Sequence, residues 1–405
     1  MSRRNNKPAN SYLIYGTLAF AGGIFAASYL YAPDFFNVRY NSPGTDSAAQ
    51  AIAARAAPSP PPAPAHIPTP KSVKGIYMTS WVAGTSASRK KVVDIIDSTE
   101  INAVVIDIKD YTGRISFPVE DPLLRETGSS EKRIRDIKEF IGELHAKNIY
   151  VIGRISSFQD AYLVNRHPEW GVRRASDGGV WKDFKGISWL DVSAKPVWEY
   201  LVALGRESYN SGFDELNFDY IRFPSDGNMK DIAYPYSGGR KKSEALKDFF
   251  AYLSERLKDP KTYGQGTTTP AISGDFFGMT TTNKDDLNIG QLLENGLRYF
   301  DYISPMVYPS HYPPHFAGYD NPNHYPYEIV KYSMDGAVTR AIAASTTPLK
   351  LRPWLQDFDY GGNYDAAAVR KQIQATYDAG LDSWLLWSPS NVYTKEALEK
   401  EEKGG

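Results

Sequence analysis

The chain has no cysteine and only six histidines among its 405 residues. It can therefore form no disulfide, and it has no thiolate to act as a nucleophile or as a metal ligand. The formal net charge is −1, which does not indicate the basic face of a nucleic-acid-binding protein. We accordingly expect no cofactor, no metal site and no nucleic-acid partner.

Aromatic residues, in contrast, are plentiful. The sequence holds 28 tyrosines, 18 phenylalanines and eight tryptophans, and 42% of it is hydrophobic. That composition is enough for a full-sized core, and the excess of tyrosine and tryptophan indicates surfaces that stack on flat groups. Sugar rings are such groups, so we expect a carbohydrate partner.

The N-terminus predicts a membrane anchor. Arg3, Arg4 and Lys7 precede an uncharged stretch over residues 8–33. Residues 12–32 are long enough to span the hydrocarbon core, and the basic residues place segment 1–11 in the cytoplasm. The remainder would then lie outside the inner membrane of a bacterium, in the periplasm or another extracytoplasmic space. A cleaved signal peptide is the alternative, with small residues at Ala26–Ser28.

A linker follows the predicted anchor. Residues 33–72 become rich in alanine and proline, as in APSPPPAPAHIPTP, a composition that favours polyproline II over packed structure. We expect this segment to act as a spacer. The globular domain is predicted to occupy residues 73–405.

Within that domain, short β-branched and aromatic runs alternate with segments of helical character. The predicted strands are 75–81, 103–110, 150–158, 215–223, 271–279, 301–309, 351–358 and 383–389. Clear helices are expected over 131–148, 195–212 and 364–380, with Gly212 and Gly380 as C-terminal caps. Eight such units predict an α/β fold, a (β/α)₈ TIM barrel. The alternative is an open doubly wound sheet, which usually carries a GxGxxG turn that the first unit lacks.

Polar and aromatic residues gather at the predicted C-terminal ends of these strands. In a TIM barrel those ends project into one site. The residues are Trp81, Asp107, Lys109, Asp110, Arg154, Asp219, Arg222, Asp275, Tyr308, Gln356, Asp357 and Trp387.

Three stretches, KGIYMTSW, VVIDIKDYTGRISFP and GFDELNFDYIRFP, resemble the putative glycoside hydrolase domain, a bacterial family first catalogued as a domain of unknown function. The resemblance covers nearly all of residues 73–395, and DYIRFP is its most specific element. It implies a TIM barrel related to α-amylase-like and α-galactosidase-like hydrolases. It also implies that the aspartate ending the fourth strand, Asp219, is the nucleophile.

The chemistry of glycosidic cleavage requires two carboxyl groups, one ionised and one protonated. Asp219 is the candidate for the ionised group, with Arg222 expected close by. A structural ion pair between Asp219 and Arg222 is the alternative. Asp275 is the candidate acid, because Phe276 and Phe277 could desolvate it; Asp357 competes for that role. We predict retention of configuration.

Substrate binding is expected from the other strand-end residues. Tyr308, Trp81 and Trp387 could stack on sugar faces, while Arg222, Gln356 and Asp357 could bind hydroxyl groups. Strand alternation places Asp107 and Lys109 on one face, where they either bind sugar or pair with each other, and Arg154 has the same two alternatives.

His311 and His315 have a metal-like spacing, but Pro313 and Pro314 prevent the helix that would align them. The deacetylases of polysaccharides need a His-rich metal site, which this spacing does not provide. The predicted function is a membrane-anchored, exported glycoside hydrolase of polysaccharide or oligosaccharide. A non-catalytic barrel that grips envelope polysaccharide is the alternative.

Overall fold

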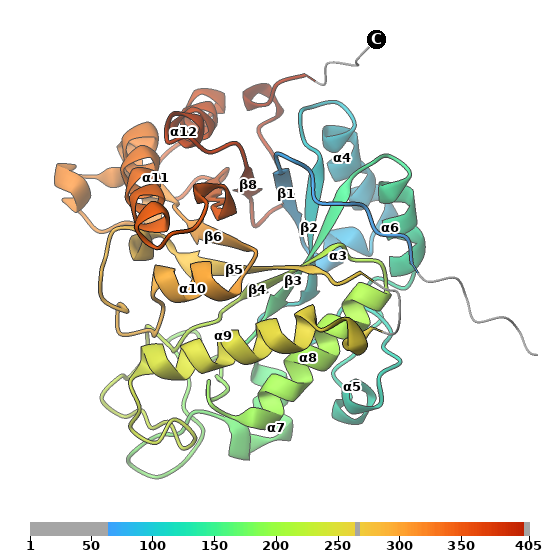
Figure 1. The fold of residues 1–405 in the computed structure, drawn as a ribbon, viewed down its shortest axis with the longest axis vertical. Coiled ribbons are helices and arrows are strands. Elements are labelled where there is room, and N and C mark those ends of the chain that lie inside the picture. The colour runs from blue at the N-terminus through green and yellow to red at the C-terminus, as the bar shows by residue number, and fades with distance from the viewer. Residues whose placement is uncertain (1–63, 264–267, 401–405) are drawn as a thin grey trace, which may run out of the picture. The chain divides into compact units, whose positions relative to one another are not determined.

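Eight parallel strands close into a barrel at the centre of the molecule (Figure 1). The computed structural model describes residues 64–263 and 268–400. Consecutive strands pair with each other, and the last pairs with the first. The predicted TIM barrel is confirmed, and the open sheet is excluded. The strands are β1 Lys74–Met78, β2 Ala103–Lys109, β3 Tyr150–Ser156, β4 Glu215–Asp219, β5 Ala271–Phe277, β6 Tyr302–Met306, β7 Trp354–Gln356 and β8 Trp384–Trp387.

Helices surround the barrel, as Figure 1 shows. Three predicted helices are confirmed as α6, α8 and α12, and Gly212 and Gly380 follow two of them with φ of 113° and 82°. Glycine adopts this left-handed backbone without the steric cost that a Cβ brings. The helices are α3 Ser80–Ala83, α4 Ser86–Ile96, α5 Pro122–Thr127, α6 Ile137–His145, α7 Ala161–Arg166, α8 Lys195–Asn210, α9 Lys242–Lys258, α10 Leu293–Tyr299, α11 Pro326–Ala343 and α12 Ala366–Asp378.

Strand alternation separates the two sides of the barrel wall. In β4, Leu216 and Phe218 are fully buried in the hydrophobic core between strands and helices. Glu215, Asn217 and Asp219 therefore face the barrel interior, because side chains two residues apart share a face. This one strand supplies three successive layers of polar side chains to the interior.

A buried ion pair fills the interior at the N-terminal ends of the strands. Arg352 Nη1 donates to Glu215 Oε2 at 2.8 Å, and Tyr150 Oη donates to the same oxygen at 3.1 Å. The ring centroid of Tyr302 lies 3.1 Å from the Arg352 guanidinium carbon. The floor of the barrel is therefore packed, and access to the interior is left to the opposite end.

The predicted membrane span, residues 12–32, lies outside the described residues. Among residues 64–263 and 268–400, no helix is both long and apolar enough to cross a bilayer. Residues 64–72 form no helix or strand. The Ile67 amide donates to Asp214 Oδ1 at 3.0 Å, and Thr69 Oγ1 lies 2.9 Å from Tyr150 Oη. Contacts with the barrel therefore begin before residue 73.

Candidate active site

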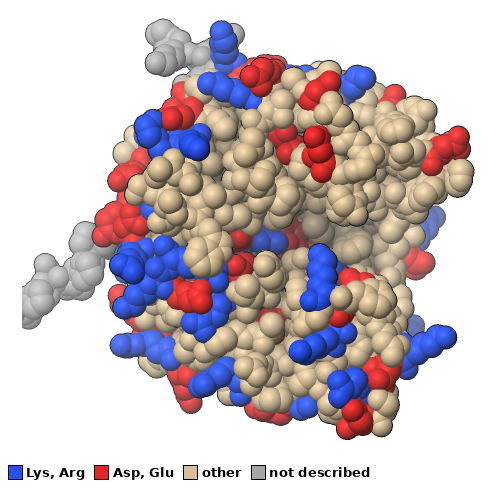
Figure 2. All heavy atoms as spheres, turned by 180° about the vertical axis from the view of Figure 1, so that it is seen from behind, with Lys and Arg blue, Asp and Glu red and all other residues tan. Residues whose placement is uncertain are grey.

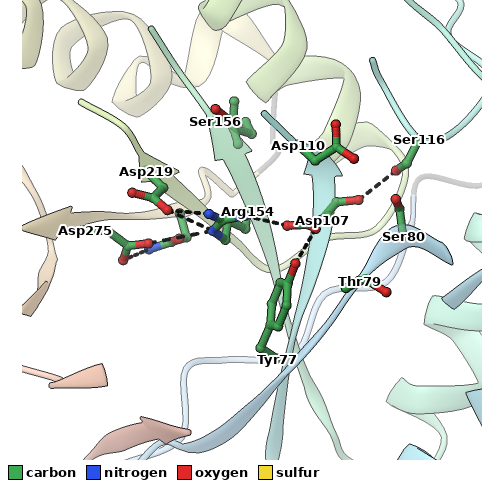
Figure 3. Close-up of polar contacts among 12 residues, drawn as sticks. Tyr77, Thr79, Ser80, Asp107, Asp110, Ser116, Arg154, Ser156, Asp219 and Asp275 are labelled. Carbon is green, nitrogen blue, oxygen red and sulfur yellow. Dashed lines mark hydrogen bonds and ion pairs between the residues drawn. The ribbon is translucent and has the colours of Figure 1, made fainter. Parts of the chain in front are cut away.

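The guanidinium of Arg154, on β3, lies at the centre of a buried network inside the barrel (Figure 3). Its Nη1 donates to Asp107 Oδ1 at 2.7 Å, and its Nε donates to Asp219 Oδ2 at 3.1 Å. Its Nη2 also donates to Asp219. Arg154 Nε lies 4.0 Å from Asp275 Oδ2. One cation thus binds or approaches carboxylates from three strands, β2, β4 and β5.

Asp219, the last residue of β4, is held from two sides. Oδ2 accepts from Arg154, and Oδ1 accepts from the Tyr220 amide at 2.6 Å. Tyr220 has φ of 50°, a left-handed conformation that non-glycine residues rarely adopt. Strain of this kind occurs where the surrounding structure fixes a functional geometry. The turn after β4 therefore aims a backbone N–H at the carboxylate.

Asp275, on β5, has a different environment. Its Oδ1 accepts from Asn217 Nδ2 at 2.9 Å and from Trp354 Nε1 at 2.8 Å. Burial and the nearby negative charge of Asp219 raise the pKa of the Asp275 carboxyl well above its ordinary value, although Arg154 opposes this. Phe276, expected to desolvate it, instead packs on the helix side of the wall against Phe250. The two carboxyl groups are therefore neighbours with unlike surroundings.

A cavity of about 990 Å³ opens above this network. Figure 2 shows the hollowed face, where acidic and basic atoms meet at the floor of a groove. Charged residues on its wall include Arg154, Lys185, Asp219, Arg222, Asp275 and Asp357. Its size suits a sugar-sized ligand, because ligand pockets usually have about 300–1,000 Å³.

Two of the predicted aromatic residues, Tyr308 and Trp387, line the cavity. Trp387 stacks on Tyr77 with ring centroids 4.0 Å apart and meets Trp354 edge-on at 5.5 Å. The Arg154 guanidinium carbon lies 5.0 Å from the Trp387 ring centroid. Trp387 is therefore fixed by its neighbours beside the carboxylates, which makes it a rigid platform.

Asp357 also lines the cavity, but its carboxylate is already bonded. Oδ1 accepts from Thr394 Oγ1 at 2.7 Å, and Oδ2 accepts from the Thr394 amide at 2.9 Å. Burial raises its pKa. Among the described contacts it makes no ion pair with Arg154, whereas Asp219 and Asp275 both lie within 4.0 Å of that guanidinium group. We therefore favour Asp275 over Asp357 as partner of Asp219.

Arg222 does not form the ion pair with Asp219 that was one of the two alternatives. It does lie near Asp219, since both residues line one cavity, and burial lowers the pKa of Arg222 while the charge of Asp219 opposes this. The ion pair of Asp219 is with Arg154, which lies 65 residues away in the chain. Arg222 lines the same cavity, where its guanidinium packs among aromatic rings. The reason is the left-handed turn at Tyr220, which ends the strand before Arg222 and breaks the alternation expected there.

Lys109 does not reach the cavity either. Its Nζ donates to Asp160 Oδ2 at 2.6 Å, and both side chains are fully buried. The register between β2 and β3 shifts between Asp107 and Lys109, so Lys109 pairs with Ile155, an outward-facing residue. Such a β-bulge places the two residues on opposite faces. The prediction that Asp107 and Lys109 share a face is therefore wrong, and with it both alternatives for Lys109, which neither pairs with Asp107 nor lines the cavity.

The structure also keeps Trp81 and Gln356 away from the cavity lining. β1 ends at Met78, and Trp81 lies on the short helix α3, 62% exposed, with Arg133 over its ring. Gln356 is fully buried, and its Oε1 accepts from Ser310 Oγ at 2.8 Å.

Asp107 is a layer beneath the cavity, bonded to Arg154 and to Tyr77 Oη. Burial raises the pKa of Asp107, although Arg154 and Tyr77 lower it.

Three residues of the site were not anticipated from the sequence: Tyr77, Asn217 and Trp354. The last two bond directly to Asp275, and Tyr77 bonds to Asp107. A signal for Asn217 was present, since it lies two residues before Asp219 on the same face of one strand. No group of three or more His, Cys, Asp or Glu side chains suited to a metal occurs within the described ranges.

A family model described as "Putative glycosyl hydrolase domain" matches residues 75–393. A search of curated proteins finds no match. A hypothetical protein from Ruminiclostridium thermocellum ATCC 27405 has 33% identity, covering 53% of this chain and 98% of its own, with a TM-score of 0.44. The PgaB (BpsB) glycoside hydrolase domain from Bordetella bronchiseptica has 11% identity, covering 81% of this chain and 98% of its own, with a TM-score of 0.57. At that identity the likeness shows the fold alone.

Proposed function

Because this chain belongs to the family described as a putative glycosyl hydrolase domain, we propose that it is a retaining glycoside hydrolase with Asp219 as nucleophile and Asp275 as acid and base. The observation that carries the proposal is the shared position of the two carboxyl groups beside Arg154 Nε, at 3.1 Å and 4.0 Å. The surroundings of the two carboxyl groups differ as the reaction requires, with one group favoured in its ionised form and the other in its protonated form. Asp219 accepts from a cation and an amide, whereas Asp275 has a raised pKa.

In this mechanism, Asp219 attacks the anomeric carbon while the carboxylic acid of Asp275 gives its proton to the leaving oxygen. The result is a glycosyl ester on Asp219 and a free alcohol. Asp275, now a carboxylate, takes a proton from water, and the water oxygen attacks the anomeric carbon and releases Asp219. Two inversions at that carbon give net retention. Arg154 holds the nucleophile, and Asn217 with Trp354 holds the acid.

The substrate contacts proposed on this basis are those of residues on the cavity wall. Trp387 and Tyr308 offer apolar ring surface beside the two carboxyl groups, and Asp357 and Arg222 offer polar groups. Sugar recognition commonly combines a flat apolar face with a few placed polar groups. A polysaccharide or oligosaccharide is the proposed substrate.

We further propose that the barrel is exported and held at the membrane by residues 12–32. Support comes from the sequence alone, where Arg3, Arg4 and Lys7 precede a long uncharged stretch. The alanine- and proline-rich residues after it would act as a spacer.

Kinetics of paired variants test the catalytic roles. On a panel of aryl glycosides, Asp219→Asn should lose nearly all turnover, because an amide of the same shape cannot form the ester. Asp275→Asn should retain turnover of glycosides with activated leaving groups and lose it with poor ones. Asp248→Asn, an exposed carboxylate on α9, is the matched control and should behave as the parent.

A trapped intermediate gives a direct readout. A 2-deoxy-2-fluoro glycoside should add one glycosyl group to the peptide that contains Asp219, as seen by mass spectrometry of the digest. Unchanged turnover in Asp219→Asn would reject the catalytic proposal and favour a barrel that binds carbohydrate without cutting it.

A further inference from the structure

Arg222 is a buried cation without a carboxylate partner among the described residues. The residue is 8% exposed, and it lies on the cavity wall. Nη1 donates to the Phe223 carbonyl at 3.1 Å and to Ser225 Oγ at 3.2 Å. Within the described ranges, Nε and Nη2 have no hydrogen-bond acceptor, and neither is sealed away from the cavity. Two nitrogen atoms of the guanidinium, which together carry three N–H bonds, are thus left for a ligand.

No nearby acid makes an ion pair with Arg222 among the described residues, although the charges of Asp219, Asp226 and Asp183 act on it at longer range. Asp219 is paired with Arg154. Asp183 Oδ2 accepts from Trp189 Nε1 and Gln159 Nε2, both at 3.0 Å. Asp226 Oδ1 accepts from the Phe184 amide at 3.2 Å. Burying an unpaired charge is costly, so a cation in this position indicates a partner that arrives from outside.

Aromatic rings hold the guanidinium in place. Its carbon lies 4.7 Å from the Phe277 ring centroid, 4.9 Å from that of Trp189 and 5.3 Å from that of Tyr220. Rings on several sides restrict the rotamers of the side chain and lower the local dielectric. A preorganised guanidinium in such surroundings binds a planar or tetrahedral anion through two parallel hydrogen bonds.

The two arginines on the cavity wall differ in their partners. Arg154 lies between Asp107 and Asp219, so its charge is already offset, whereas Arg222 makes no ion pair among the described residues. Lys185, exposed on the segment between α7 and α8, adds a further cation to the cavity wall.

We propose that Arg222 binds an anionic substituent of the sugar, the carboxylate of a uronic acid or a sulfate ester, so that the substrate is an acidic saccharide. This deepens the hydrolase function proposed above and rests on it for the role of the cavity. A uronic acid presents a carboxylate that matches the guanidinium fork, and a sulfate ester presents oxygens of the same charge. Lys185 contributes attraction at longer range.

Binding of four small probes to the purified full chain tests this. Glucuronate, galacturonate, glucose 6-sulfate and glucose are titrated separately, with ligand-observed NMR as the readout. The parent should bind at least one anionic sugar about tenfold or more tightly than glucose, because a charge-assisted hydrogen bond to a buried group contributes that much. Arg222→Gln should lower the ratio of anionic-sugar affinity to glucose affinity to about one, and Arg222→Lys should restore part of that ratio.

Lys185→Gln is a second test variant, which we expect to fold like the unmodified protein because the Lys185 side chain is exposed. It should weaken the preference for the anionic sugar only at low ionic strength. Which anionic probe binds best separates the carboxylate from the sulfate ester. Equal binding of glucose and all three anionic sugars by the parent overturns the proposal, as does an equal loss for all probes in Arg222→Gln.

The two proposals fail in distinguishable ways. The probes are monosaccharides that cannot be cleaved, so their binding does not depend on Asp219 chemistry. An anionic preference that persists in Asp219→Asn, together with unchanged turnover in that variant, would reject the hydrolase mechanism and retain the anion site. If Asp219→Asn loses turnover as expected but the unmodified protein shows no preference for anionic sugars, the hydrolase mechanism is retained and the anion site is rejected.

Discussion

Replacing Arg154 with methionine should damage stability and turnover together, whereas replacing Arg352 should damage stability alone. Both are buried arginines inside the same barrel. Arg154 bonds to Asp107 and Asp219 at the cavity floor, and Arg352 bonds to Glu215 at the opposite end. Arg352 does not line the cavity. The two variants therefore form a matched pair that separates loss of a buried ion pair from loss of the site.

The expected cost follows from what each substitution leaves behind. Removing one partner of a buried ion pair typically destabilises a protein by about 3–5 kcal/mol, because the other charge stays buried without compensation. Arg352→Met leaves one carboxylate, that of Glu215, which keeps its bond from Tyr150. Arg154→Met leaves two, Asp107 and Asp219, so we expect it at or above the upper end of that range. Urea unfolding followed by circular dichroism measures both.

The pH dependence gives a second check on the cause. Burial raises the pKa of Asp107, and Arg154 lowers it, so removing Arg154 should raise it further. A carboxyl with a raised folded-state pKa favours folding at low pH, and that contribution is lost as pH rises through the folded value. The stability gap between Arg154→Met and the parent should therefore shrink from about pH 7.5 to about pH 5.

Turnover is expected to distinguish the two variants. Arg154→Met should lose at least about a hundredfold in kcat on any active aryl glycoside, because the nucleophile is no longer held in place. Arg352→Met, assayed below its unfolding transition, should keep the kcat of the parent. Equal turnover losses in both variants, or a parent-like Arg154→Met, would refute the assignment of Arg154 as the residue that positions Asp219.

Three further results are expected. Asp275→Asn should be more stable than the parent at about pH 8, since the raised pKa of Asp275 makes its ionised form unfavourable in the fold, and thermal unfolding should show the difference vanish as pH falls toward the ordinary value of 3.8. Trp387→Ala should raise KM about tenfold or more with a smaller change in kcat, as loss of a stacking platform does, and steady-state kinetics measure it. Residues 12–32 are predicted to anchor an exported barrel, so protease added to spheroplasts should digest the domain, and protection until the inner membrane is broken would contradict the orientation.

The barrel was predictable because its strands are buried on both faces and end in recognisable turns. β7 shows the limit of that signal: residues 351–358 read as a full strand, yet only Trp354–Gln356 pair as one. Proline at 353 and the loop contacts of Gln356 shorten it. The alternation of hydrophobic residues could not report this, because loop residues next to a barrel strand are buried as well.

The site was predictable where strand alternation continues to the strand end, and not where it is interrupted. Asp219 and Asp275 follow the alternation and face inward. The bulge after Asp107 turns Lys109 outward, and the left-handed Tyr220 separates Arg222 from Asp219. Neither interrupted segment, 107–109 or 219–222, contains glycine or proline, the residues that announce such changes in a sequence. Pairing between Arg154 and Asp219 joins two strands, and no local pattern encodes it.

Burying charged side chains inside the barrel costs free energy. At the C-terminal ends of the strands the proposed catalysis accounts for that cost, but at the N-terminal ends it does not. Buried ion pairs are often no more stable than apolar packing, so the pair of Arg352 with Glu215 contributes little net stability by itself. Glu215, however, lies on the same strand as the candidate nucleophile. Glu215, Asn217 and Asp219 occupy successive inward positions of β4. A slip of β4 by one residue would turn all three side chains into the apolar layer beneath the helices. A shifted register of β4 would therefore break the ion pair between Arg352 and Glu215 and cost free energy. By disfavouring that shift, the pair helps to fix the position of Asp219 relative to Arg154 at the other end of the barrel.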